Sequence, residues 1–189
     1  MVSVRAAYLC FLALIGVERL FEMALSRRNA AWALSRGGRE YGQAHFPWMV
    51  TLHAAFLASC AVESSWRRFP GTPGWVALIA AIAAQGLRYW AVSSLGDRWN
   101  ARVIVVPGEP PVEKGPYRFL RHPNYLAVVI EMIAVPLVYG CWMTALVFSV
   151  ANAAMLRVRI RVEEEALGAA WERAFAGRSR FLPGGSGSA

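Results

Sequence analysis

Residues 123–156 read PNYLAVVIEMIAVPLVYGCWMTALVFSVANAAML, and Glu131 is the only charged residue in this apolar segment. At about 1.5 Å per residue, one continuous helix of this length would measure about 50 Å, whereas the hydrocarbon core of a bilayer is about 30 Å thick. Pro136 and Gly140 lie near the middle and are typical of a helix break. The segment therefore predicts two membrane-spanning helices, over residues 123–139 and 141–160, that fold into a hairpin.

Three more apolar runs precede this hairpin. They predict spans over residues 4–25, 46–66 and 70–92. The chain of 189 residues is 57% hydrophobic and 17% charged, whereas about a quarter of a soluble domain is charged. We therefore predict an all-α integral membrane protein with about five transmembrane helices in one domain, residues 1–182. The Gly/Ser-rich residues 183–189 predict a flexible tail.

The basic residues predict an orientation in the membrane. Fifteen of the 20 Arg and Lys residues lie after the first and third predicted spans or from the last turn of the fifth span onward, on one side of the bilayer. Because short cytoplasmic loops carry the excess of basic residues, the N-terminus is expected outside and the C-terminus in the cytoplasm. The net charge is +8, but the basic residues are spread between apolar runs. This pattern favours lipid headgroups and argues against nucleic acid as a partner.

The cysteines predict no metal centre. Cys10, Cys60 and Cys141 each lie inside an apolar run and show no CxxC spacing. Such cysteines are typical of small buried hydrophobic side chains.

Two polar segments fall on the predicted cytoplasmic side. Residues 97–125 read DRWNARVIVVPGEPPVEKGPYRFLRHPNY, a turn-rich connector, and residues 157–167 read RVRIRVEEEAL. On spacing alone, Arg159 and Glu163 fit a solvated helix with an ordinary i,i+4 ion pair. The hairpin, however, brings the start of its first helix to the end of its second, so His122 and Tyr125 are expected to face these charges. Such mixed charges suit a ligand that carries both an amino group and a carboxylate.

Three motifs together resemble the isoprenylcysteine carboxyl methyltransferase family. They are Gly115-Pro116-Tyr117, Arg121-His122-Pro123-Asn124-Tyr125 and Arg159-x-x-x-Glu163-Glu164-x-x-Leu167. The resemblance covers roughly residues 85–167. It implies a helical membrane methyltransferase whose S-adenosylmethionine pocket opens to the cytoplasm.

The resemblance also implies roles for single residues. The motif positions tied to cofactor binding, or bordering it, are Tyr117, Arg121, His122, Tyr125, Glu163 and Glu164. Arg159 matches the motif arginine and is expected to orient the substrate or the cofactor.

The sequence says less about the methyl acceptor than about the methyl donor. Several segments of the first ninety residues, such as Arg36-Gly37-Gly38-Arg39-Glu40-Tyr41-Gly42, look similar to a bacterial branch of the family. That likeness implies a bacterial cytoplasmic membrane and a lipophilic acceptor that enters from the bilayer. The acceptor group is either a phenolic lipid hydroxyl or an isoprenylcysteine-type carboxylate. The sequence does not specify the oligomeric state.

Several ionisable residues lie within the predicted spans. Glu131 is a candidate catalytic base, because a carboxylate at membrane depth is costly and usually functional. An ion pair with Arg88, or a hydrogen bond across the bundle, is the equal alternative. Glu18 and Glu22 are expected to pair with arginines, or else to line the acceptor tunnel. His53 is interpreted as a hydrogen-bond partner between helices.

Two other functions are compatible with parts of this pattern. Membrane reductases that use NADPH share the turn His122-Pro123-Asn124-Tyr125. A non-enzymatic membrane protein could also place charged helix ends against lipid headgroups. The first alternative predicts that the chain binds NADPH. The second predicts that it binds neither NADPH nor S-adenosylmethionine.

Overall fold

The computed structural model describes residues 3–181, and the predicted tail at 183–189 lies outside this range. Within it, the main elements are the helices α1 (Val4–Ser35), α2 (Phe46–Glu63), α3 (Thr72–Leu95), α4 (Pro123–Leu137) and α5 (Trp142–Ala174). The connections contain the strands β1 (Arg39–Tyr41) and β2 (Val103–Val105) and the 3-10 helices η1 (Gln43–His45), η2 (Gly96–Arg98) and η3 (Gly115–Arg118). The all-α prediction is thus confirmed, apart from two strands of three residues each.

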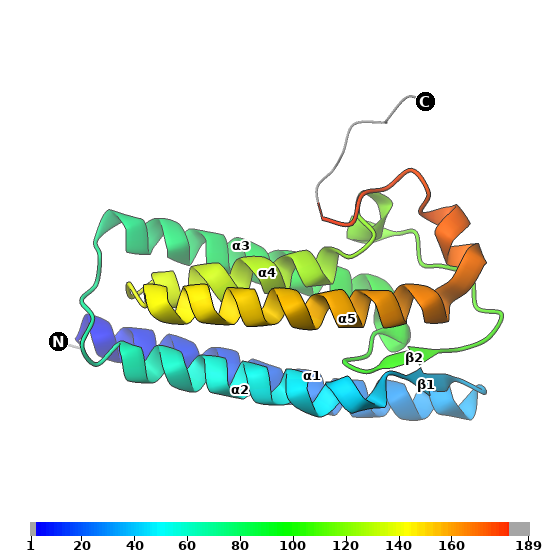
Figure 1. Ribbon diagram of the computed structural model, residues 1–189, viewed down its shortest axis with the longest axis horizontal. Helices are drawn as coiled ribbons and strands as arrows, with labels where there is room; N and C mark the ends of the chain where they lie inside the picture. Colours follow the sequence, from blue (N-terminus) through cyan, green and yellow to red (C-terminus); the bar gives the residue numbers. More distant parts are fainter. Residues whose placement is uncertain (1–2, 182–189) are drawn as a thin grey trace.

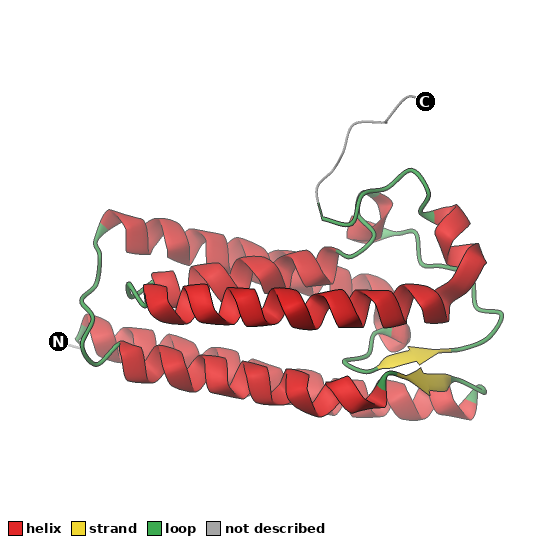
Figure 2. Cartoon of the chain, in the orientation of Figure 1, coloured by secondary structure: helices red, strands yellow, loops and turns green. Residues whose placement is uncertain are grey.

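The five helices form an elongated bundle. Figure 1 shows α1 beside α2 on one side of the bundle and α3, α4 and α5 on the other. The two strands and the end of α5 lie at the end of the bundle far from the N-terminus, as the colouring by secondary structure also shows (Figure 2). The polar segments therefore gather at one end of an otherwise apolar bundle.

The helices α4 and α5 are joined by the short turn that the sequence indicates. Helix α4 ends at Leu137, α5 begins at Trp142, and Gly140 between them has a φ of 71°. Residues other than glycine rarely adopt this left-handed conformation. The N–H of Cys141 donates to the carbonyl of Pro136 at 2.9 Å, which closes the turn. As a result, the start of α4 and the middle of α5 lie side by side.

Small residues allow α3 to pack closely against α4. Ala77, Ala81, Ala84 and Ala91 are all buried and recur every three, four or seven positions along α3. Because small side chains let two helix backbones approach in lipid, this stripe explains the close packing of the pair. The apolar core beside it includes Met132 of α4, which is 2% exposed.

Three segments are long and apolar enough to cross a membrane. They are Gln43–Glu63, Thr72–Arg98 and Trp142–Ala174. Helix α4 is apolar but shorter, and α1 carries a charged turn in its middle. Many large apolar side chains on the bundle are exposed, including Leu20, Ile79 and Val147, as expected of a surface that faces lipid. The sequence predicts five spans; these three are found, and the remaining two stay predictions.

The two strands pair with each other, which the sequence analysis does not predict. They are antiparallel, with Arg39 opposite Val105 and Tyr41 opposite Val103. This pairing ties the connection after α1 to the long loop between α3 and α4. It thereby positions residues 106–112 over the polar end of the bundle.

Candidate active site

The hydroxyl of Tyr125 connects the first turn of α4 to α5. It accepts a hydrogen bond from Arg159 Nε at 2.7 Å and donates one to the carboxylate of Glu163. Arg159 is only 5% exposed, and its guanidinium also lies over the Tyr125 ring. Two charged groups of α5 are thus held in place by one neutral hydroxyl of α4.

A second connection runs through His122 and Glu164. Nε2 of His122 lies 3.0 Å from Glu164 Oε1, and the imidazole ring stacks on Tyr125 with 5.3 Å between ring centroids. Arg180 reaches the same carboxylate through Nε at 3.0 Å and Nη2 at 2.5 Å. The hydrogen bond to Glu164 raises the pKa of the Arg180 guanidinium. Glu164 therefore joins the loop before α4 to the last residues of the described chain.

Tyr117 and Arg121 border this arrangement. Burial, and then the charge of Glu163, raise the pKa of the Tyr117 phenol above its usual range, so it stays neutral at physiological pH. Arg121 donates from Nε to the carbonyl of Arg178 at 2.5 Å and from Nη2 to the carbonyl of Ala176 at 3.3 Å. These bonds fasten the segment after α5 against the loop before α4.

A cavity of about 580 Å³ opens at this polar end of the bundle. Six of the predicted site residues line it, and these are Tyr117, Arg121, His122, Tyr125, Arg159 and Glu163. The aromatic rings of Trp32, Trp99 and Trp171 contribute to the same wall. Glu164 is not among the lining residues and contacts the cavity only through His122. We call this space the polar cavity.

A second cavity of about 260 Å³ lies deeper in the bundle. All five helices contribute to its wall, which is mostly apolar. Five residues line both cavities, and they are Trp99, Asn100, Asn124, Tyr125 and Arg159. We call this second space the apolar cavity. The two cavities are thus neighbours that share a wall of polar and aromatic side chains.

Comparison with known proteins assigns this arrangement to a family. The sequence profile of the isoprenylcysteine carboxyl methyltransferase family matches residues 75–169, which contain the shared wall and all the motif residues. The chain belongs to this family. It is 40% identical over 157 residues to the uncharacterized protein YpbQ of Bacillus subtilis (strain 168), an alignment that covers 82% of this chain and 94% of YpbQ. An uncharacterized protein of Haemophilus influenzae is 24% identical over 169 residues, covering 88% of this chain and 96% of that protein.

The family match begins within α3, so α1 and α2 lie outside it. These two helices nevertheless supply much of the wall of the apolar cavity, through residues such as Arg19, Met49 and His53. In this member of the isoprenylcysteine carboxyl methyltransferase family, the polar cavity is built largely from the matched region, and the apolar cavity depends on the remainder.

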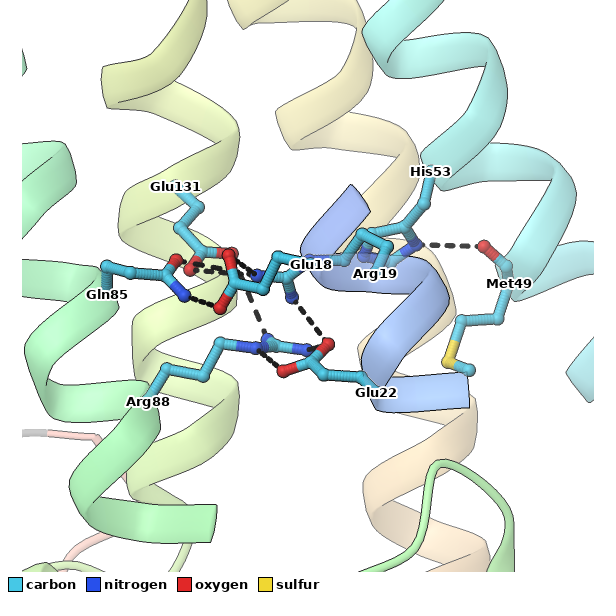
Figure 3. Close-up of polar contacts among 8 residues, drawn as sticks. All are labelled: Glu18, Arg19, Glu22, Met49, His53, Gln85, Arg88 and Glu131. Atoms are coloured by element: carbon cyan, nitrogen blue, oxygen red, sulfur yellow. Dashed lines mark hydrogen bonds and ion pairs between the residues drawn. The ribbon is translucent and has the colours of Figure 1, made fainter. Parts of the chain in front are cut away.

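Glu131 lies in a buried ion cluster beside the apolar cavity. Its carboxylate is 3.8 Å from Arg19 Nη2 and 3.8 Å from Arg88 Nη1, and Arg88 also pairs with Glu22 at 2.6 Å (Figure 3). Glu18 contacts Arg19 at 3.2 Å in the same cluster. Glu131 is not among the residues that line either cavity. The structure therefore shows the pairing with Arg88, and a catalytic role for Glu131 stays a prediction.

The sequence analysis missed the contribution of the chain after residue 167. Gly168 has a φ of 67° and kinks α5, so that Trp171 turns back and packs against His122, with 5.4 Å between the ring centroids and 37° between the ring planes. Phe175 stacks in turn on Trp171 at 4.9 Å. The single glycine within a run of helix formers was the one available signal, because glycine in a helix is costly without a structural reason.

Proposed function

We propose that this protein is an S-adenosylmethionine-dependent methyltransferase that acts on a lipophilic acceptor at the membrane. The observation that carries the proposal is the pair of neighbouring cavities, one at the polar end of the bundle and one with a mostly apolar wall to which all five helices contribute. A hydrophilic methyl donor and a lipid-like acceptor need such separate compartments with a common boundary. Holding two reactants on either side of one wall provides the proximity that a displacement reaction requires.

The residues of the polar cavity fit the proposed cofactor. When bound, S-adenosylmethionine supplies an electrophilic methyl group on a sulfonium centre. The carboxylate of Glu163 suits the amino group of such a ligand, and Arg121 suits its carboxylate. The ring of Trp171 suits a flat base or a cation. Asn124 Oδ1 is buried without a partner among the described residues, so this wall offers an unused hydrogen-bond acceptor. The volume of about 580 Å³ is typical of small-molecule sites.

Arg159 is the residue that we assign to the acceptor side of the reaction. It lines both cavities, its Nε donates to the Tyr125 hydroxyl, and its Nη1 lies 3.4 Å from the sulfur of Met49, which lines the apolar cavity. A fixed guanidinium orients an acceptor oxygen and favours its anionic form. Both candidate methyl acceptors, a phenolic hydroxyl and an isoprenylcysteine-type carboxylate, have an oxygen that the guanidinium can bind in its anionic form.

The membrane topology is part of the proposal. Five spans, with the N-terminus outside and the C-terminus in the cytoplasm, put the polar cavity on the side where a soluble cofactor is made. The loops at that end carry most of the basic residues, which supports this orientation. The relatives in Bacillus subtilis and Haemophilus influenzae support a bacterial cytoplasmic membrane. The acceptor would enter sideways from the bilayer, between helices.

Ligand-induced stabilisation in detergent tests the cofactor assignment. S-adenosylhomocysteine at about 100 times its dissociation constant should stabilise the folded protein by about 2.7 kcal/mol, whereas NADPH should not stabilise it. Glu163→Gln and His122→Ala should both weaken this effect. Stabilisation by NADPH alone would favour a membrane reductase, and no effect of either ligand would favour a non-enzymatic protein.

The second test is a search for the product. Lipid extracts of cells with and without the protein are compared by mass spectrometry for species that differ by one methylene unit. Labelling with methyl-tritiated S-adenosylmethionine then identifies the methylated lipid. Absence of any labelled lipid from membranes that contain the folded protein would contradict the proposal.

A further inference from the structure

The apolar cavity is too small to enclose a lipid-like acceptor. Its volume is about 260 Å³, below the range of about 300–1,000 Å³ that is usual for pockets enclosing drug-sized ligands. A long hydrocarbon chain attached to a group near Arg159 would therefore extend beyond this space. Because such a chain avoids water, its remainder has to lie in the lipid around the bundle. The cavity then needs an opening between two of the helices.

The wall residues that reach the outer surface of the bundle all belong to α1 and α2. Leu20 of α1 is 71% exposed, and Val50 and Ala54 of α2 are exposed as well. In contrast, every lining residue that α3, α4 and α5 contribute is buried or half-buried. The cavity therefore opens to the surrounding lipid between α1 and α2, which lie side by side in Figure 1. We call this the lateral opening.

The two helices leave space where they border the lateral opening. Gly16 of α1 and Ala54 of α2 both line the cavity, and neither has a side chain larger than a methyl group. A Cβ added at Gly16 would lie 3.8 Å from Leu57 Cδ1, an ordinary contact distance, so a methyl group would fit there. A much larger side chain at either position would occupy the opening itself.

Contacts close the other sides of α1 and α2. Helix α1 is joined to α3 by the buried ion cluster, in which Glu22 accepts from Arg88 at 2.6 and 2.7 Å (Figure 3). Helix α2 is joined to α5 by the edge contact of Phe56 with Phe148, with 5.7 Å between ring centroids. The interface between α1 and α2 is therefore the place where a chain can leave the cavity.

The lateral opening lies at the depth of the hydrocarbon. Val50 and Ala54 follow the start of α2 by four and eight residues, which places them about 6 and 12 Å along the helix. Trp48, just before them, is exposed, and exposed tryptophans are typical of the membrane–water interface. A chain that leaves beside Val50 and Ala54 therefore enters the apolar part of the bilayer.

The inner end of the lateral opening reaches Arg159. Met49, which precedes Val50, places its sulfur 3.4 Å from Arg159 Nη1. The carbonyl oxygen of Met49 lies 2.8 Å from Nδ1 of His53 (Figure 3). This bond within α2 corrects the expectation that His53 links two helices, so His53 does not bridge the opening. One molecule can thus contact Arg159 with a polar group and Val50 with its chain.

We propose that the lateral opening holds the hydrocarbon chain of the methyl acceptor, with Gly16 and Ala54 as the positions that admit it. The proposal rests on the methyltransferase function above and specifies where the acceptor enters. The family profile matches only residues 75–169, so the opening is built from the part of the chain outside the match. Selection of the hydrocarbon chain is therefore assigned to α1 and α2, and binding of the methyl donor to the motif residues.

Photolabelling tests the lateral opening without methyl transfer. The probe is a long-chain fatty acid with a diazirine in the middle of its chain, added to the protein in phosphatidylcholine nanodiscs. Its carboxylate supplies the oxygen for Arg159. Labelled peptides are identified by mass spectrometry with and without an excess of the unlabelled fatty acid. The label that the excess displaces should lie on the peptides around Leu20 and Val50. Label on Ile79, which is exposed on α3, should not be displaced.

A pair of neighbouring alanines provides the matched variants. Ala54→Trp fills the lateral opening, whereas Ala55 is exposed on the same helix and lines neither cavity. Ala54→Trp should abolish the displaceable label. It should also lower kcat/KM for a phenol with a long alkyl chain by about 10²-fold, since misplacing the reacting atoms by about 1 Å costs about this much. With a methyl group in place of the alkyl chain, the loss should be within about threefold.

The controls show that these losses are local. Ala55→Trp should retain the displaceable label and the activity on both phenols. Stabilisation by S-adenosylhomocysteine should be unchanged in both tryptophan variants, which shows that they are folded. If Ala54→Trp does not fold, Gly16→Leu replaces it, with Gly86→Leu as its control. Gly86 is exposed on α3, has open space around it and lines neither cavity.

The outcomes separate the two proposals. Displaceable label on α3, α4 or α5, or equal effects of Ala54→Trp and Ala55→Trp, would overturn the lateral opening while methyl transfer stands. If the wild-type protein binds no S-adenosylhomocysteine and methylates neither phenol, the proposed function fails. Displaceable label on α1 and α2 would in that case still support a site for a hydrocarbon chain at the opening.

Discussion

Replacing Tyr125 by phenylalanine removes the hydroxyl that joins the two charged groups of α5. Arg159 Nε would lose its acceptor, and Glu163 would lose its donor. Hydrogen bonds to charged groups contribute about 1.5–3 kcal/mol each. Because Arg159 is only 5% exposed, water cannot readily replace the lost bond. We therefore expect Tyr125→Phe to lower the free energy of unfolding by about 3 kcal/mol.

Tyr8→Phe provides the matched control. Tyr8 is equally buried and donates to the carbonyl of Val135 at 3.3 Å, but this is one bond between neutral groups. Hydrogen bonds of this kind in helical membrane proteins contribute about 0.6 kcal/mol on average. Unfolding is followed by circular dichroism during titration of detergent micelles with dodecyl sulfate. The affinity for S-adenosylhomocysteine is measured in parallel and should fall only for Tyr125→Phe. If both variants lose the same stability and bind alike, the Tyr125 bridge does not organise the site.

Two further substitutions test the frame around the site. Glu63 is 3% exposed and accepts a hydrogen bond from the N–H of Thr144, at the start of α5, at 2.8 Å. Glu63→Ala leaves that buried donor without an acceptor and should lower the free energy of unfolding in dodecyl sulfate by about 1–3 kcal/mol. The affinity for S-adenosylhomocysteine should not change. Gly115→Ala should destabilise the protein by more than the roughly 1–2 kcal/mol of a left-handed alanine, since its Cβ would lie 1.9 Å from Ser94 Oγ. Gly108→Ala, at a φ of 80° with open space around it, measures the backbone cost alone, and equal costs at both glycines would contradict the steric argument.

The α4–α5 hairpin was predictable because two simple quantities determine it. The apolar run is too long for one crossing, and Gly140 supplies the conformation that a tight turn needs. Once the hairpin is fixed, the start of α4 must meet the middle of α5. The contacts of Tyr125 with Arg159 and Glu163, and of His122 with Glu164, follow from that geometry.

The end of α1 was not predictable in the same way. The predicted span stops at residue 25, but the helix continues to Ser35 through a polar stretch. Two of its polar residues, Ser26 and Asn29, are buried because they bind another segment. Asn29, for example, donates to the carbonyls of Gly96 at 3.2 Å and Trp99 at 2.7 Å. A hydropathy scale counts such polar residues as exposed to water. A helical segment whose polar side chains bind the backbone of a distant segment is therefore predicted as a loop.

The pairing of β1 with β2 and the return of the chain after Gly168 were missed for a related reason. Both are contacts between segments far apart in sequence, and neither has the periodicity that identifies a long helix. Arg121 illustrates the point, since its hydrogen bonds are to carbonyl groups after α5. Any arginine could make such bonds, and no residue type in the later segment predicts them.

The charges inside the bundle support the assignment of the acceptor site to the apolar cavity. Arg88 donates two hydrogen bonds to Glu22 and lies 3.8 Å from Glu131, and Arg19 contacts three carboxylates within the ion cluster. Arg159 forms no ion pair within 4.0 Å among the described residues; its partners are the Tyr125 hydroxyl and the Met49 sulfur. A buried guanidinium without an anion is costly, and this cost is removed when a negatively charged group binds beside it. An acceptor that becomes anionic on losing its proton would supply that group at the wall where the two cavities meet. The same charge imbalance that lowers the stability of the empty protein would therefore favour the reactive form of its substrate.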